Sequence, residues 1–148
     1  MAVIGRSLVI GKPVAMMLMA EHATVTVCHT RTRDVPSITR EADIIVTSAG
    51  VLRSLTMEHV RPGQTVIDVS MNWDPGKNEG RGGMAGDAVY GEVSEIVDAI
   101  TPVPGGVGAV TSTVLIDHVV SAADLNAVTE EIRRIRQSQN AHYFNKAD

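Results

Sequence analysis

Aromatic residues and cysteine are scarce in this chain of 148 residues. Phenylalanine, tryptophan and tyrosine together make up 3% of the sequence, and Cys28 is its one cysteine. A single cysteine excludes an internal disulfide, and we expect a cytoplasmic protein because a reducing compartment suits this cysteine usage better than secretion does. No apolar run approaches the roughly 18 residues that a membrane-spanning helix needs. We therefore expect no membrane role.

Excess positive charge is lacking too. The 13 Lys and Arg residues are outnumbered by 17 Asp and Glu residues, which gives a net charge of -4. Nucleic-acid binding relies on a basic surface that displaces counterions from phosphates, so we expect no nucleic-acid partner. The five histidines have no metal-ligand spacing with one another or with Cys28, and we predict no metal site.

Short segments rich in β-branched residues alternate with segments of helical character. The predicted strands are Val3–Ile4, Ala23–Cys28, Asp43–Thr47 and Gln64–Val69. The predicted helical segments are Pro13–Glu21, Pro36–Glu41 and Thr56–Val60. This alternation favours an α/β fold, with a mostly parallel sheet and helices on both faces.

The rest of the chain contains one more predicted strand and two predicted helices. Asn72–Asp87 is dominated by glycine and polar residues and predicts a surface loop. A strand is expected over Ala99–Val103, followed by a helix over Val110–Ala123. The side chains expected to form the buried side of that helix are Val110, Val114 and Val120.

The composition changes after Asp124, where glutamate and arginine crowd together. A polar helix is expected over Val128–Ser138, either solvated or docked on a partner. We therefore divide the chain into a domain of residues 1–125 and a C-terminal tail of residues 126–148.

A glycine turn follows the first predicted strand. Gly5-Arg6-Ser7 and Gly11 match GxGxxG only in part, because Ser7 occupies the second glycine position and the last glycine comes one place late. A strand, a tight turn and a helix N-terminus can cradle a pyrophosphate with free N–H groups and the positive end of the helix dipole. A plain connection without a ligand fits this segment equally well.

The second predicted strand ends without the acidic residue that NAD-specific sites use to bind the ribose hydroxyls. It continues instead as Thr30-Arg31-Thr32-Arg33, whose two guanidinium groups and two hydroxyls suit the 2'-phosphate of NADP. The alternative is an exposed basic loop without a ligand. Cys28 is expected to be a small core residue, since no cation beside it would lower the pKa of its thiol.

The segment ITPVPGGVG, residues 100–108, is the strongest local signal. Its prolines fix the backbone, and its glycines allow the backbone to approach a ligand closely. Thr111 follows, with a hydroxyl that either caps the next helix or contacts a ligand. Asp68 and Asp87 stand at a strand end and a loop end, where hydrogen bonds to turn amides are expected rather than acid-base chemistry.

Six motifs in order carry a family resemblance over Val3 to about Ala123. They are VIGRSLVIGKP, ATVTVCHTRT, ADIIVTSAG, TVIDVSMN, GDAVY and ITPVPGGVGAVTSTVL. Together they resemble the C-terminal half of the bifunctional methylenetetrahydrofolate dehydrogenase/methenyltetrahydrofolate cyclohydrolase family. The resemblance implies a Rossmann-like domain that binds NADP, in an enzyme of one-carbon folate metabolism.

The resemblance also assigns cofactor roles to individual positions. It places Gly5, Arg6, Ser7 and Ile10 along the pyrophosphate and adenosine, with Arg6 and Thr30 at the 2'-phosphate. The basic-loop argument adds Arg31 to this set.

At the other end of the cofactor, the resemblance places Val69, Met71 and Thr111 around the nicotinamide. Pro104 and Gly105 would border the folate substrate. Members of the family are commonly dimers, so a homodimer is expected.

The chain departs from the family pattern in several places. The family's N-terminal domain is absent from these residues, and with it the YxxxK motif on which proton transfer and the cyclohydrolase reaction depend. We therefore expect an NADP-binding domain that is inactive alone, and that meets folate only if the missing domain is supplied. Ser70 stands where the family has glycine, which puts a side chain beside the expected nicotinamide position. The alternative is a non-catalytic dinucleotide-binding or interaction module.

Overall fold

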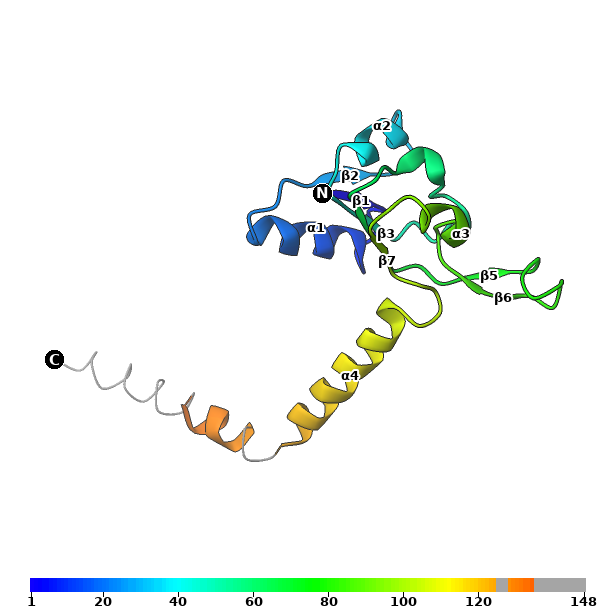
Figure 1. The fold of residues 1–148 in the computed structure, drawn as a ribbon. Helices are drawn as coiled ribbons and strands as arrows, with labels where there is room; N and C mark the ends of the chain where they lie inside the picture. Colours follow the sequence, from blue (N-terminus) through cyan, green and yellow to red (C-terminus); the bar gives the residue numbers. More distant parts are fainter. Residues whose placement is uncertain (125–127, 135–148) are drawn as a thin grey trace. The chain divides into compact units, whose positions relative to one another are not determined.

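A five-stranded parallel sheet forms the centre of the first part of the chain (Figure 1). The computed structural model describes residues 1–124 and 128–134. The chain divides into two compact units, Met1–Ala109 and Val110–Asp148. The division at residue 125 stays a prediction.

The strands of the sheet lie in the order β2-β1-β3-β4-β7, and every neighbouring pair is parallel. They are β1 Ala2–Ile4, β2 Thr26–Cys28, β3 Ile44–Thr47, β4 Thr65–Asp68 and β7 Ala99–Ile100. All five correspond to predicted strands, although most are shorter than the β-branched runs suggested. The predicted α/β, Rossmann-like architecture is confirmed.

Helices cover both faces of this sheet, as expected (Figure 1). Helix α1, Gly11–Ala20, connects β1 to β2, and α2, Val35–Arg40, connects β2 to β3. The chain moves outward from β1 to β2 and then returns past β1 to β3. Right-handed crossovers in opposite directions place α1 and α2 on opposite faces.

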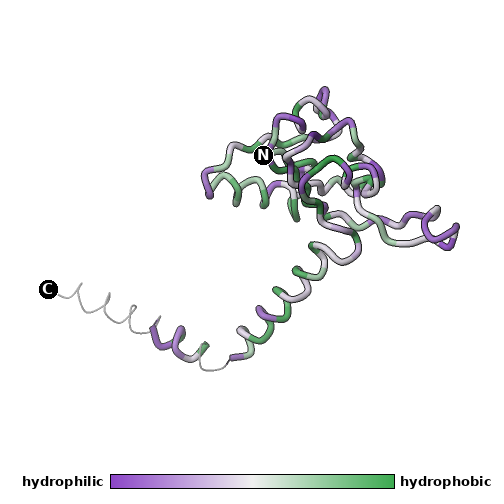
Figure 2. The backbone as a smooth tube through the Cα atoms, in the orientation of Figure 1, coloured by the Kyte–Doolittle hydropathy of each residue, from purple (hydrophilic) through white to green (hydrophobic). Residues whose placement is uncertain are grey.

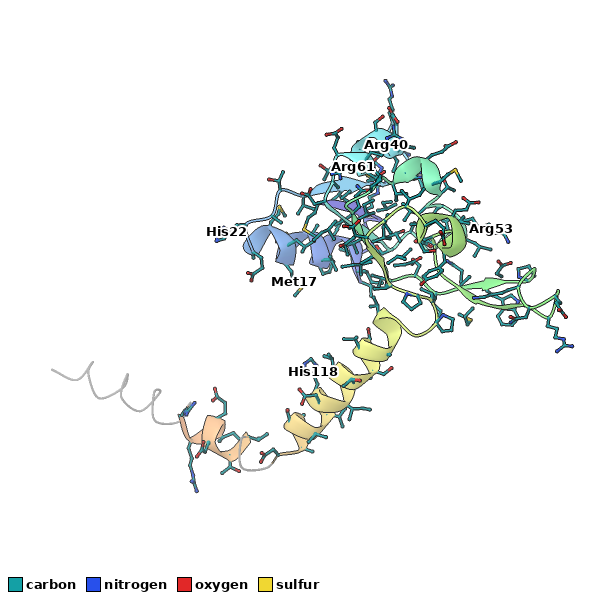
Figure 3. All side chains as sticks on the ribbon, viewed as in Figure 1. Met17, His22, Arg40, Arg53, Arg61 and His118 are labelled. Atoms are coloured by element: carbon teal, nitrogen blue, oxygen red, sulfur yellow. The ribbon has the colours of Figure 1, made fainter. Side chains whose placement is uncertain are left out.

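Two shorter helices complete the first unit. The 3-10 helix η1, Met57–His59, packs beside α2, and α3 spans Tyr90–Val93. Two arginines fasten η1 to α2 (Figure 3): the Arg40 guanidinium donates to the Glu58 carbonyl, and Arg61 Nε donates to the Arg40 carbonyl at 2.6 Å. Helix α3 was not predicted from the sequence.

The two faces of the sheet carry separate apolar clusters. Ala2, Ile4 and Ile45 pack into the larger one, whereas Val3 and Val46 pack with Ala15 of α1 into the smaller one. Successive residues of a strand point to opposite faces, so adjacent residues of β1 and β3 are buried on opposite sides. Burial on both faces explains why these strands are almost continuously apolar.

The predicted surface loop Asn72–Asp87 contains an unpredicted antiparallel hairpin. Its strands are β5, Asn72–Asp74, and β6, Gly83–Ala85, with Trp73 paired to Met84. Figure 2 shows hydrophilic residues at its tip. The segment is rich in glycine and polar residues and lacks an alternating apolar pattern, so its composition gave no sign of this pair.

Helix α4, Val107–Ala123, starts three residues before the predicted helix. Its expected buried side is not buried: Val110, Val114 and Val120 are 63%, 45% and 64% exposed. A helix needs other elements against its apolar side chains to bury them, and Val110–Ala123 falls in a unit whose only other described secondary structure is a helical segment, 128–134. The remaining residues of the predicted polar helix, 135–138, lie outside the described part of the chain.

No helix among residues 1–124 and 128–134 combines the length and the apolar character needed to cross a membrane.

We predict that Gly11→Ala destabilises the protein. A Cβ at Gly11 would lie 2.3 Å from the Gly5 carbonyl oxygen, a backbone atom that cannot move freely. The expected loss in the free energy of unfolding is about 2 kcal/mol, within the range for overpacking. Gly91→Ala is the control, since a Cβ there meets nothing within 4 Å. Urea titration followed by circular dichroism measures both, and equal stability of the two variants would contradict the argument.

Candidate functional site

The candidate site lies at the carboxyl edge of the sheet, between β1 and β3. The chain leaves β1 toward one face and returns to β3 from the other, which makes this the topological switch point where ligands bind in open α/β sheets. The turn after β1 and the loop after β3 are in direct contact. Ser48 N, at the start of that loop, donates to the Ile4 carbonyl at 2.8 Å. The turn is also held to the end of β2, where Gly5 N donates to the Cys28 carbonyl at 2.9 Å.

The turn after β1 is tight enough to require glycine at two positions. Gly5 has φ +121°, and a Cβ on it would lie 2.6 Å from Ser48 Oγ. At Gly11 a Cβ would meet the Gly5 carbonyl, as described above. The absence of both side chains lets the backbone fold closely over the start of α1. Binding of an anion at this turn stays a prediction.

Ser7 belongs to the same turn, and its hydroxyl caps the start of α1. Its Oγ accepts from Ile10 N at 3.0 Å and from Gly11 N at 3.3 Å. These two N–H groups are among those that a helix leaves without an internal partner. Arg6 is exposed beside them. The positive end of the helix dipole and a guanidinium group therefore lie at one turn.

A cavity of about 380 Å³ opens at this edge. Four of the predicted cofactor residues line it: Gly5, Arg6, Ser7 and Thr30. Its walls also include residues that the sequence did not single out, among them Val35 of α2 and Ser48, Ala49, Val51, Ser54 and His59. Its volume is in the range of small-molecule sites.

The basic loop after β2 is folded into a turn. His29 N donates to Thr32 Oγ1 at 2.9 Å, and Arg31 N donates to His29 Nδ1 at 3.1 Å. The Thr32 hydroxyl is thus used within the loop, whereas Thr30, Arg31 and Arg33 are exposed. Within the described residues, neither Arg31 nor Arg33 forms an ion pair. The loop presents unpaired positive charge beside the cavity.

Other predicted cofactor residues do not line this cavity. Val69 is partly buried and packs against the apolar cluster on the α1 face, and Met71 is 71% exposed just beyond β4. Ile10 is partly buried at the start of α1. Thr111 lies on α4 in the second unit. Their predicted contacts with the nicotinamide or the pyrophosphate stay predictions.

The predicted substrate loop has an unusual backbone. The Val103-Pro104 peptide bond is cis, and Gly105 has φ +103°, a conformation that side chains rarely allow. Pro104 and Gly105 are both exposed. At the start of this loop, Thr101 Oγ1 accepts from Asp68 N at 2.8 Å. The backbone of the loop is accessible, and its role with folate stays a prediction.

A buried carboxylate, Asp87, holds the loops that follow β3 and β4. Its Oδ2 accepts from Thr47 Oγ1, Ala49 N and Ser70 Oγ at 2.9, 2.7 and 2.7 Å, and more weakly from Gly50 N at 3.3 Å. Its Oδ1 accepts from Val51 N and Asn72 Nδ2 at 2.9 and 3.0 Å. The sequence correctly predicted turn-amide bonds for Asp87 but not the number of segments it joins.

Asp68 is a second buried carboxylate at the same edge. It accepts from Ala88 N at 2.8 Å and from Ser70 N at 3.1 Å, again as expected. Burial raises the pKa of Asp68, and the nearby Asp87 charge adds to this effect. Gly86 permits the close packing, since a Cβ there would lie 2.1 Å from Asp68 Oδ2.

Ser70, which the sequence resemblance places where glycine is usual, does not project as a free side chain. Ser70 is 8% exposed, and its hydroxyl donates to Asp87 and accepts from Gly50 N at 3.2 Å. The additional side chain therefore becomes part of the hydrogen-bond network that supports the edge of the sheet.

His59 is one of two histidines that line the cavity, with His29, and the sequence assigned a role to neither. Its Nδ1 lies 3.2 Å from Thr56 N and 3.1 Å from Thr56 Oγ1, so the ring caps η1. Burial lowers the pKa of His59, and the positive charge of Arg40 lowers it further. The spacing of Thr56 and His59, three residues apart as in a capping box, is a sequence signal that could have indicated this role.

Cys28 and the possible metal ligands add no further site among the described residues. Cys28 is fully buried, and burial raises the pKa of its thiol, as expected for a core residue. In the described segments, His, Cys, Asp and Glu form no group of three or more that is suited to hold a metal ion.

We predict that Asp87→Ala lowers the free energy of unfolding by about 3 kcal/mol, because several buried donors then lack a partner. Thermal unfolding followed by circular dichroism measures the loss. Asp98→Ala is the control, since the Asp98 carboxylate is exposed and accepts a single hydrogen bond from the described residues, from Gly63 N at 3.1 Å. A loss at Asp87 no larger than at Asp98 would contradict the role assigned to it.

His59 gives the stability a defined pH dependence. Its pKa in the folded protein lies below 6.5, so the unfolded chain binds more protons between that lowered pKa and 6.5. Stability therefore falls as the pH falls through this window. We predict that His59→Asn flattens this part of a plot of Tm against pH, whereas the exposed His22→Asn leaves it unchanged. An unchanged slope in His59→Asn would contradict the assignment.

Comparison with known proteins places the chain in a family. Residues 1–127 match the model described as tetrahydrofolate dehydrogenase/cyclohydrolase, NAD(P)-binding domain. The bifunctional protein FolD of Carboxydothermus hydrogenoformans is 50% identical over 123 residues, which cover 83% of this chain and 42% of that protein. The chain thus spans about two fifths of the length of the curated relatives it matches.

Solved structures support the same family assignment. The bifunctional 5,10-methylenetetrahydrofolate dehydrogenase/cyclohydrolase of Thermoplasma acidophilum is 44% identical, with a TM-score of 0.73 over 83% of this chain and 43% of that one. The Trypanosoma brucei enzyme, solved with NADP and an inhibitor, is 37% identical, with a TM-score of 0.71 over 91% of this chain and 44% of that one. The chain therefore belongs to the family of tetrahydrofolate dehydrogenase/cyclohydrolase NAD(P)-binding domains.

Proposed function

We propose that this chain binds NADP in the cavity at the carboxyl edge of its sheet. The observation that carries this proposal is the combination of the glycine turn over the start of α1 with the exposed, unpaired arginines of the loop after β2. The turn suits a pyrophosphate, and the arginines suit a phosphate on the adenosine ribose. The Trypanosoma brucei relative, solved with NADP, supports the same choice.

In this proposal each predicted residue has a defined place. Gly5 and Ser7 lie along the pyrophosphate, with Ile10 just beyond them. Arg6, Thr30 and Arg31 meet the 2'-phosphate. The nicotinamide end is assigned to Val69, Met71 and Thr111.

We further propose that the chain forms the cofactor-binding part of a methylenetetrahydrofolate dehydrogenase/cyclohydrolase. Bound NADP would supply the hydride acceptor for oxidation of the folate substrate. Pro104 and Gly105 would border that substrate. The curated relatives are more than twice as long as the part that matches, so we expect no turnover by these 148 residues alone. We also propose that the chain forms a homodimer and is located in the cytoplasm.

We predict that NADP binds more tightly than NAD, as measured by isothermal titration calorimetry. Arg31→Ala should weaken NADP binding about tenfold, the loss of one strong charge-assisted contact, and leave NAD binding unchanged. Arg81→Ala is the control, since Arg81 is exposed in the connection between β5 and β6. Equal affinities of the unmodified chain for NADP and NAD would contradict the phosphate assignment.

The dehydrogenase proposal has a separate test. Absorbance of NADPH reports turnover of methylenetetrahydrofolate, and we expect none from this chain alone. A second chain that carries the YxxxK motif should restore turnover when it is mixed with this one. If NADP binds but no such mixture becomes active, the chain is better described as a dinucleotide-binding module without catalysis.

A further inference from the structure

The cavity reaches beyond the turn that suits phosphates. Arg6 and Ser7 line it from the β1–α1 turn, whereas Val35 and His59 line it from α2 and η1. Helix α1 covers one face of the sheet, and α2 and η1 cover the other (Figure 1). A dinucleotide whose phosphates lie at the start of α1 would therefore extend its adenosine toward α2 and η1.

Ser54 lines this second part of the cavity with an unsatisfied hydroxyl. Its Oγ is buried and has no hydrogen-bond partner, and it is the one such side-chain atom found among the described residues. Buried polar atoms in folded proteins nearly always have a partner. Rotation about the single χ1 torsion of serine can present this hydroxyl to a ligand.

His59 lines the same part of the cavity in a fixed tautomer. The Thr56 N–H donates to its Nδ1, so Nδ1 carries no proton and the neutral ring carries its proton on Nε2. Within the described residues, Nε2 has no hydrogen-bond partner. His59 therefore offers a donor, while the Ser54 hydroxyl can accept.

We propose that Ser54 and His59 recognise the Watson–Crick edge of the adenine base, with His59 Nε2–H donating to N1 and the N6 amino group donating to Ser54 Oγ. This edge is the part of the base farthest from the ribose. Val35 and Val51 line the same part of the cavity and would contact the apolar faces of the ring. The two side chains thereby select adenine among purines.

This inference rests on the proposed binding of NADP. The discriminating ligand is the hypoxanthine analogue of NADP, in which N1 carries a proton and oxygen replaces the amino group. The N1–H would then face the fixed Nε2–H of His59, two donors without an acceptor. Calorimetric titration of the full chain should give a dissociation constant about tenfold weaker for the analogue than for NADP.

Variants separate base recognition from a structural effect. His59→Asn keeps a side-chain oxygen for the cap of η1 but is too short to reach the base. In this variant the dissociation constants of NADP and its hypoxanthine analogue should agree within about twofold. Ser54→Ala removes a hydroxyl that the free protein leaves unsatisfied. It should weaken NADP binding about fivefold while Tm stays unchanged or rises by about 3 °C.

His22→Asn is the matched control, since His22 is exposed at the end of α1, away from the cavity (Figure 3). It should retain the full discrimination between NADP and the analogue. Equal binding of both ligands by the unmodified chain would overturn the base-recognition proposal alone. Failure of the unmodified chain to bind NADP would overturn the proposed function, and base recognition with it.

Discussion

Backbone N–H groups in the loops beyond a buried sheet edge need acceptors, and at this edge one carboxylate accepts from three consecutive ones. Asp87 accepts from the three consecutive amides of residues 49–51 and from side chains at the ends of β3 and β4. Because a buried amide without a partner is costly, the loops after these strands can hold their conformation only while this carboxylate is in place. The wall of the cavity that Ala49 and Val51 form depends on it.

The glycine turn supports the opposite wall by a different means. Gly5 and Gly11 have no Cβ atoms, so the backbone at Gly5 can lie against Ser48 and the backbone at Gly11 can lie against the Gly5 carbonyl. On one side of the cavity the Asp87 carboxylate holds the loop after β3. On the other side, the lack of side chains at Gly5 and Gly11 lets the turn after β1 pack closely. Both arrangements hold the backbone at the edge of the cavity in a fixed geometry.

Several features of the fold could be read from local sequence. The β-branched runs around Val3, Val27, Val46 and Val66 identified four strands because a parallel sheet buried on both faces demands such residues. The hairpin around Trp73 was not predicted, because its segment is rich in glycine and polar residues and shows no alternating apolar pattern. Helix α3 is a single turn and too short to show a periodic pattern.

Local sequence also singled out four residues that line the cavity, because glycine offers backbone freedom and serine, threonine and arginine offer hydroxyls or charge. Gly5, Arg6, Ser7 and Thr30 are therefore both predicted residues and cavity residues. His59 and Ser54 carry no such signature, and only folding brings η1 and the loop after β3 against α2. The position of Ser70 was apparent from the sequence, but the direction of its hydroxyl depended on Asp87, 17 residues away. Chemical type is a property of each residue alone, whereas the partner of a buried polar group is set by chain segments that meet only in three dimensions.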